Sequence, residues 1–133
     1  MSTSEKKVKA MKKAMMRSSS SDADLAASLH TTSQELRSLR LRMSGDPNKD
    51  EIGERNNPNL NSFFGVARRG TMSSYGPTTM HKANFDHAKA EYSSISKTLS
   101  KIVSEIDGLE TKLIKMGAPY IEGQPLRVIW EDN

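Results

Sequence analysis

The fold is decided by residues 85–116, FDHAKAEYSSISKTLSKIVSEIDGLETKLIKM. Apolar side chains in this stretch recur at alternating spacings of three and four residues over more than four heptads. This is the a/d pattern of a long helix that packs along another helix. The seam consists of Phe85, Ala88, Tyr92, Ile95, Leu99, Ile102, Ile106, Leu109, Leu113 and Met116.

A second tract with the same period lies nearer the N-terminus. Its apolar positions keep one heptad phase and predict a long helix over about 4–43, capped by Ser4. A break at 18–21 is the alternative, with Ser21 or Asp22 as a new cap, because serine favours helix ends over helix interiors. The apolar members are Val8, Met11, Met15, Leu25, Leu29, Leu36, Leu39 and Met43.

Glycine and proline mark where both tracts end. The first stops at residues 44–47, SGDP, and the second spans about 79–116, between Gly76-Pro77 and residues 117–119, GAP. Lengths of about 40 and 38 residues correspond to helices near 60 and 57 Å. Such matched lengths favour an antiparallel hairpin, in a register that places Met43 near His81.

The connector and the tail complete the predicted fold. Residues 59–69 predict a short helix whose Phe63 and Phe64 cover the turn end of the hairpin, near Met43 and Phe85. Residues 117–133 predict an extended tail over the helices, anchored by Trp130, the only tryptophan. We therefore expect one all-α domain over 1–133: a long antiparallel helical hairpin, a connector helix and a tail.

Composition limits the class of protein. The chain has 133 residues, of which 35% are hydrophobic and 5% aromatic, so one domain with a small core is expected. The absence of cysteine excludes disulfides and thiolate metal sites. No apolar run approaches the roughly 18 residues of a membrane span, and no signal peptide is recognisable. These features predict a cytoplasmic protein by default, or an extracytoplasmic one if it belongs to a larger protein.

Motifs for chemistry are weak. Residues 46–50, DPNKD, open like a calcium loop, but Glu51 and Asn57 replace the glycine and the glutamate of that motif, which favours a polar turn. His81 and His87 are six residues apart and so fall on different faces of a helix. We find no nucleophile elbow and no phosphate-binding glycine loop. The sequence predicts no enzyme, metal, cofactor or small-molecule substrate.

Positive charge is concentrated at the N-terminus. Residues 1–17 carry a local charge of +5, which leaves the other residues near −1. Such a cluster can contact nucleic-acid phosphates or an anionic membrane surface, or can be the solvated face of a helix. A small basic nucleic-acid-binding protein is therefore the alternative function. The candidate anion contacts are Lys6, Lys7, Lys9, Lys12, Lys13 and Arg17.

The seams point to association as the main function. A two-helix hairpin buries little apolar surface relative to the entropy of ordering it, so a partner protein or a second copy is expected. The polar seam members Ser18, Asp22 and Thr32 mark where such a partner would enter. The predicted packing residues are Phe85, Tyr92, Ile95, Leu99, Ile102, Ile106, Leu109, Leu113, Leu25, Leu29, Leu36 and Leu39.

Short motifs in a fixed order carry a resemblance to a known family. They are residues 39–46 (LRLRMSGD), 55–58 (RNNP), 73–78 (SSYGPT) and 117–120 (GAPY), with Leu109-Glu110 ending the long helix before the last of them. Together they resemble the C-terminal helical region of sortilin-like β-propeller proteins with BNR repeats, over roughly residues 30–125.

This resemblance implies a non-catalytic helical appendage. The propeller itself is absent, so the glycosyl hydrolase label of that family transfers to no residue here. The chain also departs from the family by lacking a tryptophan near Thr71-Met72-Ser73-Ser74 and a threonine-proline pair at Ile121-Glu122. The implied partner is a propeller supplied by another chain, or another copy of the chain.

Overall fold

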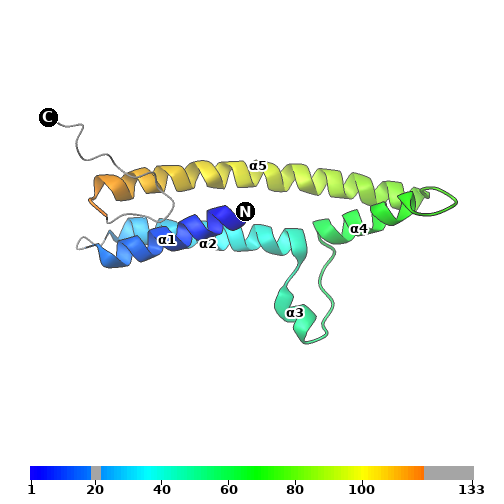
Figure 1. Ribbon diagram of the computed structural model, residues 1–133, viewed down its shortest axis with the longest axis horizontal. Helices are drawn as coiled ribbons and strands as arrows, with labels where there is room; N and C mark the ends of the chain where they lie inside the picture. The colour runs from blue at the N-terminus through cyan, green and yellow to red at the C-terminus, as the bar shows by residue number, and fades with distance from the viewer. Residues whose placement is uncertain (19–21, 119–133) are drawn as a thin grey trace. The chain divides into compact units, whose positions relative to one another are not determined.

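The computed structural model describes residues 1–18 and 22–118, and this part of the chain contains five α-helices and no strand (Figure 1). The all-α prediction is confirmed for it. The predicted tail lies outside the described residues from 119 onward. The helices are α1 (Ser2–Arg17), α2 (Ala23–Ser44), α3 (Pro47–Glu51), α4 (Leu60–Thr71) and α5 (Thr79–Lys115).

The first tract is divided into two helices. α1 ends at Arg17, and Ser18 has extended backbone angles. The carboxylate of Asp22 accepts hydrogen bonds from the backbone N–H groups of Asp24 at 2.9 Å and Leu25 at 3.2 Å, the geometry of an N-cap. One continuous helix over 4–43 is therefore wrong, and the alternative with Asp22 as the new cap agrees with the structure.

The five helices contribute to two compact units. Of the described residues, unit 1 contains those up to Ser33 and those from Ser104 to Ala118, whereas unit 2 contains Gln34–Val103. α2 and α5 each contribute one segment to either unit.

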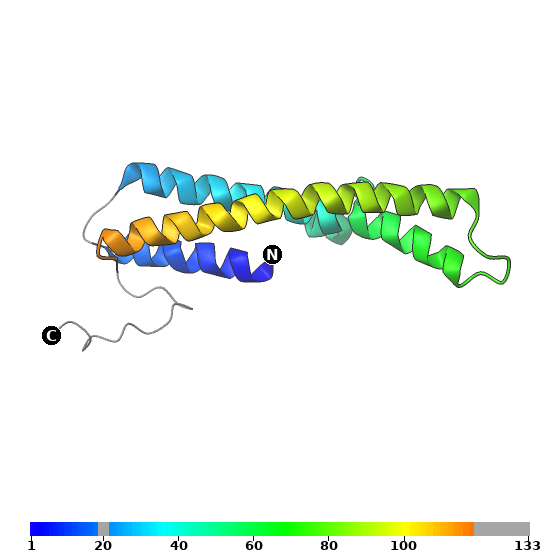
Figure 2. The same cartoon turned by 90° about the horizontal axis from the view of Figure 1, so that it is seen from above.

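Unit 1 consists of α1, the beginning of α2 and the end of α5. α1 and the end of α5 run in the same direction, and α2 runs opposite to both (Figure 2). The predicted hairpin places the whole first tract, including α1, antiparallel to α5. This prediction is wrong for α1, because the chain reverses direction between α1 and α2. The buried side chains of unit 1 are Val8, Met11, Ala14, Leu25, Leu29, Thr32, Ile106, Leu109 and Leu113.

Unit 2 consists of the end of α2, α3, α4 and the longer, N-terminal part of α5. Arg42 at the end of α2 donates from Nε to Glu91 at 2.9 Å and from Nη2 to Ser94 at 3.1 Å. The predicted register places Arg42 near residue 82 of α5, so the observed contact with Glu91 lies nine residues further along that helix. The buried side chains of unit 2 are Leu36, Leu39, Leu60, Ala88, Ile95 and Ile102.

The register of α2 against α5 differs from the predicted one because α4 packs beside the start of α5. A β-carbon at Gly70 of α4 would lie 2.6 Å from Cγ of His81, so the backbone of α4 lies directly against the His81 side chain at this point. α4 thus packs against the part of α5 that was predicted to contact Met43. Its range agrees with the short helix predicted near 59–69.

Most predicted helix ends are found in the structure. Gly45 follows α2 with φ of +81°, and Gly117 follows α5 with φ of +73°, the left-handed conformation expected after a helix. The predicted polar turn contains the short helix α3, whose N-cap Asp46 accepts from the Asn48 N–H at 3.0 Å.

Candidate protein-docking site

One column of the α5 seam is buried in unit 1 and exposed in unit 2. The column recurs every seven residues: Phe85, Tyr92, Leu99, Ile106 and Leu113. In unit 1, Ile106 and Leu113 are each 1% exposed. In unit 2, Phe85 is 52% and Tyr92 63% exposed, and Leu99 is half-buried. The two aromatic members of the predicted seam are therefore not packed in the core of unit 2.

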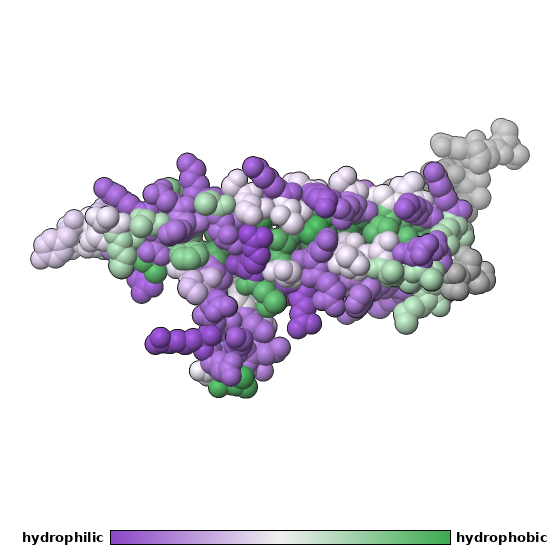
Figure 3. All heavy atoms as spheres, turned by 180° about the vertical axis from the view of Figure 1, so that it is seen from behind, coloured by the Kyte–Doolittle hydropathy of each residue, from purple (hydrophilic) through white to green (hydrophobic). Residues whose placement is uncertain are grey.

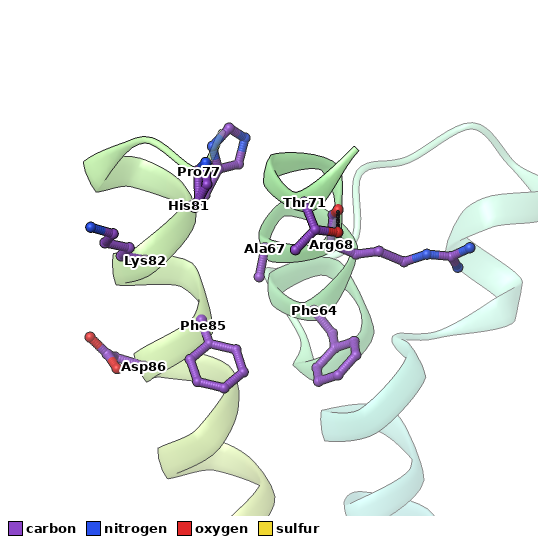
Figure 4. Close-up of a pocket in the computed structure, with 9 residues that line it drawn as sticks. All are labelled: Phe64, Ala67, Arg68, Thr71, Pro77, His81, Lys82, Phe85 and Asp86. Carbon is purple, nitrogen blue, oxygen red and sulfur yellow. Dashed lines mark hydrogen bonds between the residues drawn. The ribbon is translucent and has the colours of Figure 1, made fainter. Parts of the chain in front are cut away.

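The exposed part of the column borders a groove between α4 and α5 within unit 2. Two adjoining clefts of about 540 and 350 Å³ share Phe64 and Phe85 as lining residues. Figure 4 shows both rings at the same end of the larger cleft. We call these two clefts the α4–α5 groove. Its apolar lining consists of Leu60, Phe64, Ala67, Pro77, Phe85, Ala88 and Tyr92.

Local interactions fix the two helices that form the groove. The Asn59 side chain accepts from the Ser62 N–H at 3.0 Å, and the Ser62 hydroxyl accepts from the Asn59 N–H at 2.8 Å, which is a capping box at the start of α4. At the start of α5, Nδ1 of His81 accepts from the Thr78 N–H at 3.0 Å. Both groove walls are thus held at their N-terminal ends.

An aromatic contact joins α4 to α5 outside the lining of the groove. The rings of Phe63 and His87 have centroids 5.6 Å apart. Phe63 is half-buried, whereas its neighbour Phe64 is 56% exposed. The predicted pair of connector phenylalanines is therefore split: Phe63 contacts His87 of α5, and Phe64 lines the groove.

Charged side chains flank the apolar lining. Arg68 extends from α4, and Lys82 and Asp86 extend from α5, each with its charged end directed away from the cleft between the helices (Figure 4). Lys89 lies one heptad after Lys82 and lines the second cleft. The rim therefore carries three cations and one carboxylate.

Apolar side chains reach the surface here. On the face drawn in Figure 3, green side chains appear over α4 and the adjacent part of α5, among purple ones. The aliphatic members of this column are buried or, at Leu99, half-buried, whereas the exposed members Phe85 and Tyr92 are aromatic. This change of residue type along the column is the sequence signal that could have distinguished the groove from the core.

The polar seam residues predicted as the entry point of a partner do not line the α4–α5 groove. Thr32 is 4% exposed, and its hydroxyl donates to the Ser28 carbonyl at 2.9 Å, so it is a satisfied core residue. Asp22 serves as the N-cap of α2. Neither side chain leaves a gap that a partner would need to fill.

The basic residues of α1 divide into two groups. The Lys7 ammonium contacts Asp107 at 2.8 Å and Glu110 at 2.6 Å. Lys12 is half-buried. The exposed residues Lys6, Lys9, Lys13 and Arg17 recur at spacings of three and four, on the helix face opposite the buried side chains.

The ion pairs of Lys7 raise the pKa of its ammonium group. Partial burial lowers the pKa of the ammonium, but hydrogen bonds and charge attraction from Asp107 and Glu110 together outweigh burial. The pKa of Lys7 is therefore raised above its ordinary value of 10.5. The ammonium of Lys7, one of the predicted anion contacts, is thus paired with two carboxylates within unit 1.

Metal-binding clusters and membrane-spanning helices can be assessed directly in the part of the chain that the structure describes. It holds no group of three or more His, Cys, Asp or Glu side chains placed to bind a metal ion. None of its helices combines the length and apolar character needed to cross a bilayer. Comparison with known protein families, characterised proteins and solved structures finds no match to this chain.

Proposed function

We propose that this chain is a non-catalytic association module that packs against a partner protein or a second copy through an exposed helix surface. The observation that carries the proposal is the exposure of Phe85 and Tyr92 in unit 2, on the seam column that is buried in unit 1. Exposed apolar surface that continues a packed interface is typical of protein interaction sites.

In this proposal α2 and α5 act as an antiparallel helical hairpin, and their seams form a coiled-coil scaffold. α1 and α4 each cover one part of it. The sequence resemblance to the C-terminal region of sortilin-like proteins makes a protein that carries a β-propeller, among other elements, one candidate partner. The module would then be a subunit of a complex and contribute binding surface rather than chemistry.

Site-specific photo-crosslinking tests the proposal. We expect a photo-reactive residue at position 85 of the full chain to crosslink to a discrete protein, or to a second copy, in cells that produce the chain. The matched control is position 75, because Tyr75 is 99% exposed and lies outside the groove. A folded chain that crosslinks at neither position, or equally at both, contradicts the proposal.

A second candidate function rests on the exposed basic stripe of α1. Lys6, Lys9, Lys13 and Arg17 could contact successive phosphates of a nucleic acid, because one helix face presents all four. Binding to duplex DNA should then weaken with salt, with a log–log slope no steeper than about −4. Replacing the four residues with glutamine should abolish that binding and leave the helix content unchanged. Binding that does not depend on salt contradicts this function.

A further inference from the structure

The α4–α5 groove has an internal counterpart in unit 1. There, α1 lies beside the end of α5, because Lys7 of α1 contacts Asp107 and Glu110, which lie between the column residues Ile106 and Leu113 in the sequence. Val8 and Met11 of α1 are 2% and 0% exposed, so a helix with an apolar face covers that part of the column. Unit 2 presents Phe85 and Tyr92 of the same column without such a cover.

We propose that the α4–α5 groove binds an amphipathic helix of a partner protein whose apolar face is flanked by aspartate and glutamate. This inference rests on the proposed association function and names the chemistry of the partner. The groove lies between α4 and α5, and the α5 residues that line it extend from His81 to Tyr92, which is about three helical turns. A partner helix of this length presents anchors at i, i+3 or i+4, and i+7.

The charge of the groove rim determines which charge the flanking residues of the partner helix should carry. In unit 1, acidic side chains of α5 pair with a lysine of the covering helix, so sign complementarity already operates at this interface. In unit 2 the rim has the opposite sign: Arg68, Lys82 and Lys89 outnumber the single carboxylate Asp86. Electrostatic complementarity therefore selects a partner with acidic flanks.

The same charges disfavour a second copy as occupant. α1 of another copy is lysine-rich and would place like charges against the rim. A symmetric dimer through the groove would bring the basic rims of both copies together, because a two-fold interface pairs a surface with itself. A separate acidic helix avoids both conflicts.

Two designed peptides test the inference with the full chain. Both are 14-residue helices with leucine at the anchor positions, and their flanking residues are all glutamate in one and all lysine in the other. Fluorescence anisotropy should give at least about tenfold tighter binding of the glutamate peptide at low salt. Phe85→Ala should weaken that binding by about tenfold, whereas Tyr75→Ala, outside the groove, should not change it.

Charge reversal distinguishes charge-selective binding of the glutamate peptide from nonspecific binding to an apolar surface. In the double variant Arg68→Glu, Lys82→Glu the preference should invert toward the lysine peptide, with thermal melts verifying that each variant folds. Equal binding of the two peptides, or no binding of the glutamate peptide, overturns the inference. Tighter binding of a peptide spanning residues 119–133, or dimerisation of the chain that Phe85→Ala abolishes, also overturns it. If the peptide results overturn the inference but position 85 still crosslinks to a protein in cells, the proposed association function stands. If position 85 forms no crosslink either, both the association function and the inference about the groove are refuted.

Discussion

Gly70 of α4 lies directly against the imidazole of His81 on α5: a β-carbon at position 70 would be 2.6 Å from Cγ of His81. The imidazole cannot easily move aside, because its Nδ1 accepts a hydrogen bond from the Thr78 N–H at 3.0 Å. The contact sets how closely the two groove-forming helices approach each other.

Gly70→Ala should therefore destabilise the protein. Alanine normally stabilises a helix relative to glycine by about 1 kcal/mol, but the clash with His81 should reverse the sign and cost about 1–3 kcal/mol. The free energy of unfolding from urea titrations measures the effect. Gly65→Ala in the same helix is the matched control, because no atom lies within 4 Å of its β-carbon position. It should stabilise; equal gains from both substitutions would contradict the close approach.

Arg42 and Glu91 fix the register of α2 against α5 in unit 2. Both side chains are partly exposed, so a double-mutant cycle with Arg42→Ala and Glu91→Ala should give a coupling energy of about 0.5–1 kcal/mol. The control cycle pairs Glu91→Ala with Arg37→Ala, an exposed residue of the same helix. Coupling in the control cycle as large as in the first would show that the interaction is not specific to this pair.

Helix positions were predictable because their signals are local. Gly45 and Gly117 end helices, and Asn59 begins one, through interactions among residues close in sequence. The break between α1 and α2 was predicted only as the alternative, because the heptad phase of the first tract continues from α1 into α2. The preference of serine and aspartate for helix ends, at Ser21 and Asp22, was the signal that favoured it.

The register and the groove depend on contacts that periodicity does not encode. A heptad seam fixes which face of α5 is apolar, but it does not fix how far α2 extends along that face. In unit 2 the close approach of Gly70 to His81 places α4 there instead. For the same reason the spacing of Phe85 and Tyr92 predicted packing but could not show that no helix of unit 2 covers them.

Asn56 holds the loop that contains α3. Its Oδ1 accepts from the Asp46 N–H at 2.7 Å, and its Nδ2 donates to the Asp46 carbonyl at 3.0 Å and to Asp50 at 2.6 Å. Asn56→Ala should cost about 1–2 kcal/mol and accelerate hydrogen exchange at the Asp46 amide, measured by NMR. Asn57→Ala replaces an exposed neighbour and should change neither value. Unchanged exchange in Asn56→Ala would rule out this role.

Lys7 should make the stability of unit 1 depend on pH only under alkaline conditions. Its pKa in the folded state is raised above 10.5, so its stabilisation is fully present below pH 10.5 and is lost as the pH rises through the folded-state pKa. Lys7→Gln should therefore lower the free energy of unfolding by up to about 1 kcal/mol at pH 7, since the pairs are partly exposed. Urea titrations between pH 7 and about pH 11.5 should show that this difference shrinks only above about pH 10.

Lys9→Gln provides the comparison, because Lys9 is an exposed lysine two residues along the same helix. It removes the same charge from α1 and so corrects for the general effect of lowering the net charge. If the difference between Lys7→Gln and the parent protein stayed constant to pH 11.5, the ammonium could not be its source. The lysine methylenes would then stabilise α1 by packing on α5, and attraction to Asp107 and Glu110 would not be what holds α1 over the seam.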